Sequence, residues 1–357
     1  MYFGSDNSVG ASPKIMAAIA EANQQGAEPS YGNDSYCKAA TDKIREFFNH
    51  DAAVFFVPTG TAANALALAQ LTQRWSCILA HQDSHITIDE CNAVEMQTGG
   101  TRILGLPGEG GKIFPAVLAQ TLKTLPRKRP HNAKPGALSL SQCTESGLVY
   151  TPDEISALTG IAKLENIAVH MDGSRFANAV ATLGCTPAEI TWKSGIDVLS
   201  LGATKNGALQ AEAVVFFNPA QAENFDYLRK RAGHLVSKGR LLGAQFNAWL
   251  SDNHWLELAQ HANSMATRLA TGLQKIPGIK LAYTPQANEV FAILQRQGHE
   301  KLQTLGATYY EWQDSGLPDH LRPLPQSDVF VRLVTSWQTQ PEQVDSFTAA
   351  VRQTHQP

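Results

Sequence analysis

Apolar and polar positions alternate in a regular way through the first two thirds of the chain. Between about residues 53 and 218, six short apolar runs each end in a polar turn, and most turns lead into a helical stretch: 53–57, 77–80, 102–106, 137–140, 167–171 and 198–201. Apolar strands that alternate with helices are typical of a mostly parallel sheet covered on both faces. The pattern predicts an α/β fold.

The regions on either side of this core have different patterns. Helical stretches at about 13–23 and 36–48 precede it and leave residues 1–12 as an arm free to cross a subunit surface. After an apolar run at 211–217 the chain turns largely helical, then supplies strands and a last helix, near 290–294, 329–334 and from Pro341. We predict two domains: residues 1–243, an N-terminal arm and a large domain, and residues 244–357, a smaller α/β domain.

Composition excludes several classes of protein. The 357 residues are 43% hydrophobic with a formal net charge of −3, and no basic block of the kind that nucleic acid requires is present. The chain begins without a charged and apolar leader, and no run of eighteen apolar residues follows, so we expect a cytoplasmic protein without a membrane span. The five scattered cysteines predict reduced thiols rather than disulfides or a metal site.

Two polar segments follow apolar runs and carry reactive groups at predicted strand ends. Asp172 lies in Met171-Asp172-Gly173-Ser174-Arg175, and Lys205 lies about one strand-crossover-strand unit later, in Ala203-Thr204-Lys205-Asn206-Gly207. Pyridoxal 5′-phosphate (PLP) needs a lysine amine for its Schiff base and a carboxylate that keeps its pyridine nitrogen protonated. Lys205 and Asp172 are the candidates. Taken alone, each also fits a surface lysine in a Gly-rich turn or a helix-capping Asp.

Two further strand ends carry candidates for cofactor binding. Gly60 and Thr61 open an Ala/Leu-rich helix after an apolar strand, where free N–H groups and the helix dipole favour a phosphate. The segment is neither a Walker A loop nor a dinucleotide fingerprint, and a capped helix after a tight turn remains the alternative. His85 follows the next strand and suits stacking on a planar cofactor or proton transfer, although it also fits a histidine at a helix start.

Two arginines are candidates for a carboxylate site. Arg332 interrupts the apolar run 329–334, and a strand arginine that faces inward needs an anionic partner. A bidentate grip on an α-carboxylate is the functional interpretation, and a structural ion pair is the alternative. Arg175, three residues after Asp172, fits either the same carboxylate site or a position that braces the pocket.

Seven segments in one order along nearly the whole chain resemble those of low-specificity L-threonine aldolases: Ser5-Asp6-Asn7, Tyr31-Gly32-Asn33-Asp34, 59–64, Asp83-Ser84-His85, 170–176, Thr204-Lys205-Asn206-Gly207 and Arg332-Leu333. The stretches 141–145 and 184–189 look closest to the bacterial branch. The resemblance implies the aspartate-aminotransferase fold (PLP fold type I). It also implies cleavage of L-threonine, L-allo-threonine and related β-hydroxy-α-amino acids to glycine and an aldehyde.

The resemblance assigns roles residue by residue. It makes Lys205 the Schiff-base lysine, Asp172 the partner of the pyridine nitrogen and His85 the residue that stacks on the ring. The implied cofactor-binding set is Lys205, Asp172, Gly60, Thr61, His85, Arg175 and Arg240, and the implied substrate-binding set is Ser5, Tyr31, Arg175 and Arg332. Arg240, with Lys238 as a helper, and Tyr31 would serve the neighbouring subunit's site, which implies a homodimer or homotetramer with shared active sites.

One departure from the family pattern concerns the base that removes the β-hydroxyl proton. Other branches place a second histidine before the Ser146-Gly147 pair, and this chain has Gln142-Cys143-Thr144 there. His85 acting through a water is the leading hypothesis for the base. The alternative functions are a phenylserine or 3-hydroxyaspartate aldolase, a β-eliminating lyase on the same scaffold, a non-catalytic PLP-binding protein, and a nicotinamide enzyme, which lacks its Gly-rich fingerprint.

Overall fold

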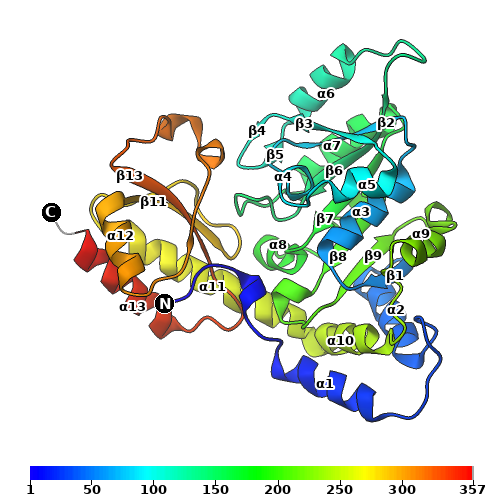
Figure 1. Ribbon diagram of the computed structural model, residues 1–357, viewed down its shortest axis with the longest axis horizontal. Coiled ribbons are helices and arrows are strands. Elements are labelled where there is room, and N and C mark those ends of the chain that lie inside the picture. The colour runs from blue at the N-terminus through cyan, green and yellow to red at the C-terminus, as the bar shows by residue number, and fades with distance from the viewer. Residues whose placement is uncertain (356–357) are drawn as a thin grey trace.

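The computed structural model describes residues 1–355 and contains two units, each built on its own sheet (Figure 1). The larger unit holds a seven-stranded sheet in the order β1-β9-β8-β7-β6-β2-β3. Neighbouring strands are parallel except at β9, which runs antiparallel to β1 and β8. The bounds are β1 Ala53–Val57, β2 Ser76–His81, β3 Arg102–Leu106, β6 Lys134–Ser141, β7 Ala168–Gly173, β8 Val198–Gly202 and β9 Glu212–Phe216. The predicted α/β class with a mostly parallel sheet is confirmed.

Apolar side chains bury both faces of this sheet because each strand sends alternate residues to opposite sides. In β9, Ala213 and Val215 join the largest core cluster, whereas Val214 and Phe216 join a second cluster on the other face. Helices α2, α6, α7, α8 and α10 contribute to the first cluster, and α3 and α9 to the second. The near-continuous apolar strands of the sequence are therefore strands covered on both sides.

The helices of the larger unit begin at recognisable signals. Thr59 caps α3 by accepting from the Ala62 N–H at 3.2 Å, and α7 begins with a capping box between Thr151 and Glu154. The bounds are α1 Pro13–Gln24, α2 Ser35–Phe48, α3 Gly60–Leu71, α4 His85–Ile88, α5 Ala93–Thr98, α6 Pro115–Thr124, α7 Pro152–Leu164, α8 Phe176–Leu183, α9 Phe225–Arg231 and α10 Arg240–Leu250. A short hairpin joins β4 Gly108–Glu109 to β5 Lys112–Ile113.

The smaller unit is an antiparallel four-stranded sheet in the order β10-β11-β13-β12, packed on three helices (Figure 1). In β13, Val329, Val331 and Leu333 face these helices, while Phe330 packs in a separate cluster on the opposite face. Arg332 alternates with these residues along the strand, so its side chain lies on the opposite face of the sheet, which is turned toward the larger unit. The bounds are α11 His254–Gln274, β10 Lys280–Leu281, β11 Glu289–Gln295, α12 Arg296–Thr304, β12 Tyr310–Glu311, β13 Asp328–Val334 and α13 Pro341–Thr354.

The first residues of the chain are held by the smaller unit. Phe3 is fully buried against Phe347, with ring centroids 4.9 Å apart, and its N–H donates to the Thr308 carbonyl at 2.7 Å. Phe3, within the arm expected over residues 1–12, is therefore not free, and the crossing of a subunit surface by the rest of the arm stays a prediction. The division at residues 243 and 244 falls inside α10 and stays a prediction. The consequence for the site is that Ser5 and Asp6 are fixed where the two units meet.

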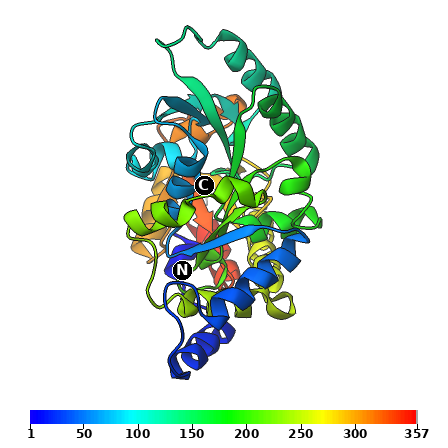
Figure 2. The ribbon, with the colours of Figure 1, turned by 90° about the vertical axis from the view of Figure 1, so that its right-hand side faces the viewer.

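Helices α1, α2 and α10 pack together at one end of the molecule (Figure 1 and Figure 2). We expect Gly243→Ala to destabilise the protein by about 1–3 kcal/mol, because a Cβ there would lie 2.6 Å from the backbone of Tyr36 and Cys37 in α2. Gly160→Ala in α7 is the matched control, since an added Cβ has no neighbour within 4 Å and alanine favours the helix by ~0.5–1 kcal/mol. Thermal unfolding of both variants checks this, and equal melting temperatures would contradict it.

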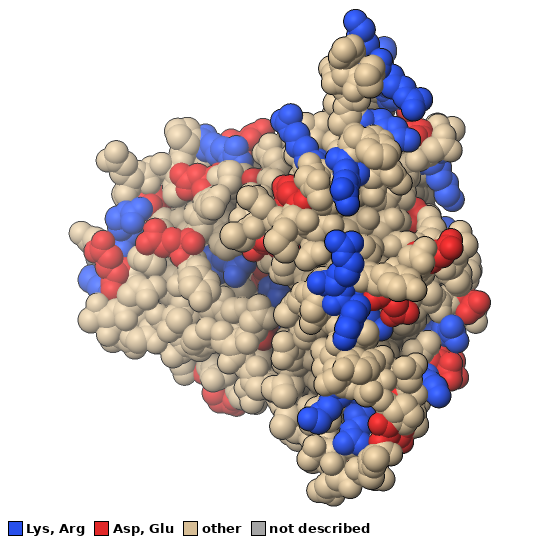
Figure 3. Space-filling model, turned by 45° about the vertical axis from the view of Figure 1, so that its right-hand side comes forward, with Lys and Arg blue, Asp and Glu red and all other residues tan. Residues whose placement is uncertain are grey.

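The surface shows basic and acidic side chains interspersed over both units on the face in Figure 3. No helix within residues 1–355 is both long and apolar enough to cross a membrane. All five cysteines are free thiols.

Candidate active site

Four neighbouring parallel strands bring chemically active residues to one edge of the large sheet. His85 follows β2, Glu145 follows β6, Asp172 lies at the end of β7 and Lys205 follows β8. Because parallel strands deliver their carboxyl ends to one edge, residues far apart in sequence converge there. Gly202 permits a close approach between the end of β8 and the turn after β7, since an added Cβ would lie 2.8 Å from Ser174 backbone atoms.

Two adjoining clefts at this edge share Asn7, His85, Ser174 and Lys205. The first, here called the substrate cleft, is also lined by Ser5, Asp172, Arg175 and Arg332. The second, here called the phosphate cleft, is also lined by Gly60, Thr61, Glu90, Thr204 and Glu212. The surface is hollowed between the two units in Figure 3. The structure thus brings together eight predicted residues: Ser5, Gly60, Thr61, His85, Asp172, Arg175, Lys205 and Arg332.

Asp172 is a buried carboxylate held by three hydrogen bonds. Its Oδ1 accepts from the Ser174 hydroxyl at 2.7 Å and N–H at 3.0 Å, and its Oδ2 accepts from the Asn64 amide at 2.8 Å. Burial alone would raise the pKa of Asp172, but the charges of His85 and Lys205 and the Ser174 bond hold that pKa below its usual value. The carboxylate therefore stays ionised at neutral pH.

His85 is held by the buried carboxylate of Glu90. Its Nδ1 lies 2.8 Å from Glu90 Oε1, which also accepts from the Asn64 amide at 2.8 Å. This hydrogen bond raises the pKa of His85 against the effect of burial, and Asp172 adds to the rise. The ring is thus fixed beside Asp172: one polar atom of each of His85, Glu90 and Asp172 lies within 4.8 Å of the others.

The N-terminus of α3 faces the phosphate cleft. Gly60 and Thr61 begin the twelve-residue helix and line the cleft together with Lys205. Free N–H groups and the positive end of the helix dipole favour an anion there. Burial raises the pKa of Glu212, on the wall of the same cleft, to about 7, which lowers its repulsion of an anion.

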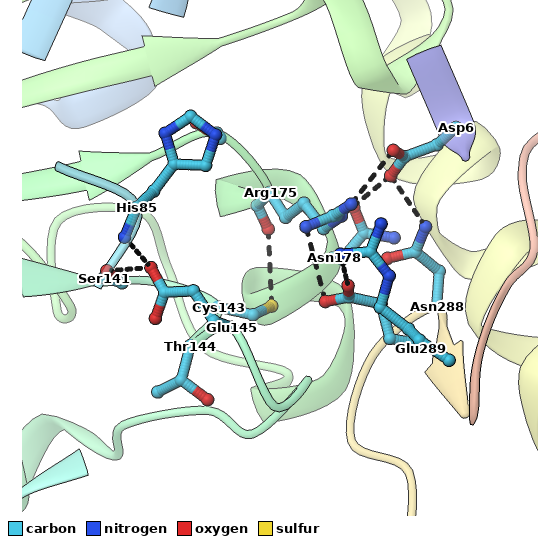
Figure 4. A network of polar contacts seen from close by, with 12 residues as sticks. Asp6, His85, Ser141, Cys143, Thr144, Glu145, Arg175, Asn178, Asn288 and Glu289 are labelled. Atoms are coloured by element: carbon cyan, nitrogen blue, oxygen red, sulfur yellow. Dashed lines mark hydrogen bonds and ion pairs between the residues drawn. The ribbon is translucent and has the colours of Figure 1, made fainter. Parts of the chain in front are cut away.

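Four charged residues from both units meet at the other end of the substrate cleft. Figure 4 shows three of them, Asp6, Arg175 and Glu289. Arg175 donates to Asp6 through Nε at 2.7 Å and Nη2 at 3.0 Å, and its Nη1 lies 3.3 Å from Glu289. Arg332 lies 3.8 Å from Glu289 and stacks on Trp312, 4.2 Å from the ring centroid. Burial lowers the pKa of Arg332, whereas Asp6 and Glu289 outweigh burial and raise that of Arg175.

These ion pairs leave Arg332 more available than Arg175 to bind the carboxylate of a ligand. Its Nε has no hydrogen-bond partner, and neither does either oxygen of the fully buried Glu289 carboxylate. Arg175 is instead fixed by a bidentate ion pair. The polar cluster can therefore accept a carboxylate mainly at Arg332.

Three predicted residues lie outside both clefts. The Tyr31 N–H donates to the Ser237 carbonyl at 2.9 Å, and Tyr31 is 44% exposed, with the Lys230 amine over its ring. Lys238 is exposed, and Arg240 donates to the Gly26 carbonyl at 2.8 Å. These three residues do not line either of the clefts that contain Lys205 of the same chain, so any role at an active site requires a neighbouring subunit.

The sequence motifs did not single out four acidic residues and one aromatic residue that build the clefts: Glu90, Glu145, Glu212, Glu289 and Trp312. Glu212 and Glu289 each occupy the first position of an apolar strand. A charge at the start of a buried strand is costly unless paired, and this signal is visible in the sequence.

The residues present fit PLP. An amine at Lys205 lines both clefts, an ionised carboxylate at Asp172 suits a protonated pyridine nitrogen, and a helix N-terminus suits the phosphate. Lys205 lines both the cleft that contains Asp172 and the cleft that contains the start of α3, so the amine lies between the carboxylate and the helix N-terminus. The groups of PLP that these three features would bind follow one another in the same order.

Comparisons with known proteins agree with the geometry. The β-eliminating lyase family matches residues 3–297. The low-specificity L-threonine aldolases of Pseudomonas sp. strain NCIMB 10558 and Pseudomonas aeruginosa are each 41% identical over 98% of this chain and 96% of their own. A solved threonine aldolase of Leishmania major superposes with a TM-score of 0.90 at 31% identity, covering 99% of this chain and 98% of that one.

A more distant solved structure shows the fold alone. The serine palmitoyltransferase of Sphingomonas wittichii gives a TM-score of 0.73 at 17% identity over 99% of this chain and 86% of its own. The resemblance and the predicted aspartate-aminotransferase fold are both confirmed. This chain belongs to the low-specificity L-threonine aldolases within the β-eliminating lyase family, and it is a PLP-dependent lyase.

Proposed function

We propose that this protein cleaves the Cα–Cβ bond of L-threonine, L-allo-threonine and related β-hydroxy-α-amino acids, giving glycine and an aldehyde. The observation that carries the proposal is that Lys205, Asp172 and the arginine pair Arg175 and Arg332 line one cleft. An amine, a carboxylate and a carboxylate clamp in one place match an amino acid joined to PLP. The printed names of the Pseudomonas relatives support the substrate class.

The roles of the cofactor-facing residues follow from their positions. When bound, PLP supplies an electron sink at the substrate's Cα. Lys205 holds the cofactor and exchanges protons at Cα, and Asp172 keeps the proton on the ring nitrogen. The His85 ring, fixed by Glu90, would lie against the cofactor, and the N–H groups at Gly60 and Thr61 would hold its phosphate.

The substrate's carboxylate is held at the opposite end of the cleft. Arg332 supplies the more available cation, and Arg175 and Ser5 complete the site. Fixing the carboxylate at one end and the amine at the other would restrict rotation about Cα and so orient the Cα–Cβ bond for cleavage. This orientation selects the bond that breaks.

Aldehyde release tests the proposal. Purified protein with PLP is given L-threonine, L-allo-threonine, D-threonine or L-phenylserine, and aldehyde and glycine are measured. We expect equal amounts of both products from the L-isomers alone. Ammonia and a keto acid without glycine would instead indicate β-elimination and overturn the proposal.

We expect Arg332→Leu to lower kcat/KM for L-threonine about 100-fold, mostly through KM, because the variant loses a charge-assisted grip on the carboxylate. The dissociation constant for glycine, read from the cofactor's absorbance, should rise in parallel. Arg268→Leu is the matched control, since Arg268 forms an exposed ion pair with Asp345 on α13. An unchanged glycine affinity in Arg332→Leu would contradict the assignment.

We also propose that the protein works as a homodimer or a dimer of dimers, in which Arg240, assisted by Lys238, and Tyr31 reach the neighbouring subunit's cofactor. Their position outside this chain's own clefts, together with the Tyr31–Ser237 hydrogen bond that ties the two segments to each other, supports this arrangement. Sedimentation of the active protein tests it, and an active monomer would contradict it.

A further inference from the structure

Glu145 is an acidic side chain in the substrate cleft that the proposed roles leave unused. Its Oε1 accepts from the His85 backbone N–H and from the Ser141 hydroxyl, both at 2.8 Å (Figure 4). Both bonds anchor one oxygen of the carboxylate beside His85, the residue that would stack on the cofactor. The position of Glu145 is therefore tied to that of His85.

The second oxygen of Glu145 is buried and has no hydrogen-bond partner. A buried acceptor without a partner is unfavourable, and a hydroxyl donor from a ligand would relieve it. Glu145 also lines an outer cleft that shares Asp89 and Trp312 with the substrate cleft. It thus lies at the junction between the site of the amino acid and a space into which a substrate side chain can extend.

Burial raises the pKa of Glu145 to about 7, against the two hydrogen bonds to Oε1. The titratable groups around it come from three elements: Asp172 at the end of β7, Tyr150 before α7, and His85 and Asp89 at the two ends of α4. A carboxyl group that titrates near neutral pH suits a general base. It can accept a proton at neutral pH and release it again.

The other groups near this junction suit the role less well. The Glu90 hydrogen bond favours the protonated form of His85, which reduces its capacity to accept a proton. Burial raises the pKa of the Cys143 thiol, so it stays protonated, and the Thr144 hydroxyl already donates to the Gly110 carbonyl at 2.7 Å. The base proposed from the sequence, His85 through a water, is therefore not the one that the contacts favour.

We propose that Glu145 is the general base for the substrate's β-hydroxyl, an inference that rests on the proposed aldolase function. The β-hydroxyl donates to the unpartnered Oε2 and transfers its proton there. The oxygen's electron pair forms the aldehyde C=O as the Cα–Cβ bond breaks, and the electron pair of that bond stays with the Cα fragment. A proton then adds at Cα to give glycine, and Glu145 returns its own proton to solvent, so atoms and charge balance.

The decisive comparison is between two reactions of the Glu145→Gln holoenzyme. Cleavage of L-threonine needs a base for the hydroxyl, whereas exchange of the glycine α-hydrogen in D₂O does not. We expect the variant's kcat for cleavage to fall about 100-fold or more, and its exchange rate to stay within about threefold of wild type. Glu165→Gln, which changes an exposed carboxylate paired with Arg127, should alter neither rate.

Each outcome decides the inference. Equal losses in cleavage and exchange would mean that Glu145 only positions His85, and unchanged cleavage would assign the proton to another base. If cleavage were unchanged in Glu145→Gln and His85 were the base, His85→Asn would lose cleavage while keeping exchange of the glycine α-hydrogen. Failure of the wild-type protein to release aldehyde from any L-substrate would instead overturn the proposed function, which separates the two failures.

A second measurement requires no activity. The infrared spectrum of cofactor-free wild-type protein should show a buried carboxylic acid that titrates near pH 7 and is missing from Glu145→Gln. Glu212, whose pKa burial also raises to about 7, supplies a second signal that remains in the variant and shows that it is folded. Identical titrations of the two proteins would overturn the proposal even if the variant were inactive.

Discussion

Lys205→Ala is expected to abolish covalent attachment of PLP and to lower kcat for L-threonine cleavage on the order of 10³-fold or more, because a reacting amine is lost. Among the described residues lining the two clefts, Lys205 is the one lysine, so no neighbouring amine can replace it. Borohydride reduction followed by peptide mass analysis checks this directly. Wild-type protein should carry the label on the peptide with Lys205, and the variant should carry none.

Lys193→Ala is the matched control for this experiment. Lys193 is exposed on a short turn before β8, where its amine lies over the Trp192 ring. It should retain full labelling and full activity. Labelling of another lysine in wild-type protein, or full activity of Lys205→Ala, would remove Lys205 from the mechanism.

The strands of the large sheet were predictable from the sequence, because each is apolar on both faces and ends at a polar turn. The observed β1 and β3 match the expected ranges, and β8 extends one residue beyond its range. The ends of β2 and β7 differ from the expected ranges by one or two residues, and the largest difference is at β6, which begins at Lys134 rather than Ala137. Pro135 and Gly136 are unfavourable in strands, and here they lie beside an irregularity in register next to Cys77.

The N-terminal segment could not be placed from sequence. Tyr2 pairs with Thr308, and the Val334 N–H donates to the Phe3 carbonyl at 2.8 Å. Contacts between residues so far apart in the chain depend on how the two units fold together, and no local pattern records them. The same contacts position Ser5 in the cleft and Asp6 against Arg175, so a part of the site depends on this long-range packing.

The convergence of Lys205, Asp172 and His85 was predictable because strand ends of a parallel sheet share one edge. The role of Glu145, which follows the strand between those of Asp172 and His85, was not predictable, because an isolated Glu after a strand is usually solvated. Whether Glu145 or Glu289 is buried depends on neighbours from other elements, such as His85 for the first and Arg175 for the second. Electrostatic details of the site therefore require the structure.

Asp172→Asn is expected to lower kcat for cleavage about 1,000-fold while PLP still binds, because a neutral amide no longer stabilises a proton on the pyridine nitrogen. Packing should survive the change. Asn64 donates to Oδ2 of Asp172 in the wild-type protein, and the Oδ1 of Asn64 is buried without a partner. A flipped Asn64 amide can therefore accept from the amide that replaces the carboxylate, at the expense of the bond between Asn64 and Glu90.

The role of the Asp172 charge is isolated by assaying the variant with PLP and with a PLP analogue whose ring nitrogen is methylated. The methylated nitrogen carries a permanent positive charge, so it needs no carboxylate to keep a proton. We expect the analogue to recover a substantial part of the activity that Asp172→Asn loses. Asp153→Asn is the control, since it changes an exposed carboxylate in the first turn of α7, and the analogue should not raise its activity. If the analogue failed to recover activity while it bound normally, the effect of Asp172 would lie in the position of Asn64 and Ser174 rather than in its charge. The buried carboxylate would then support the geometry of the site, and the ring nitrogen would need another partner.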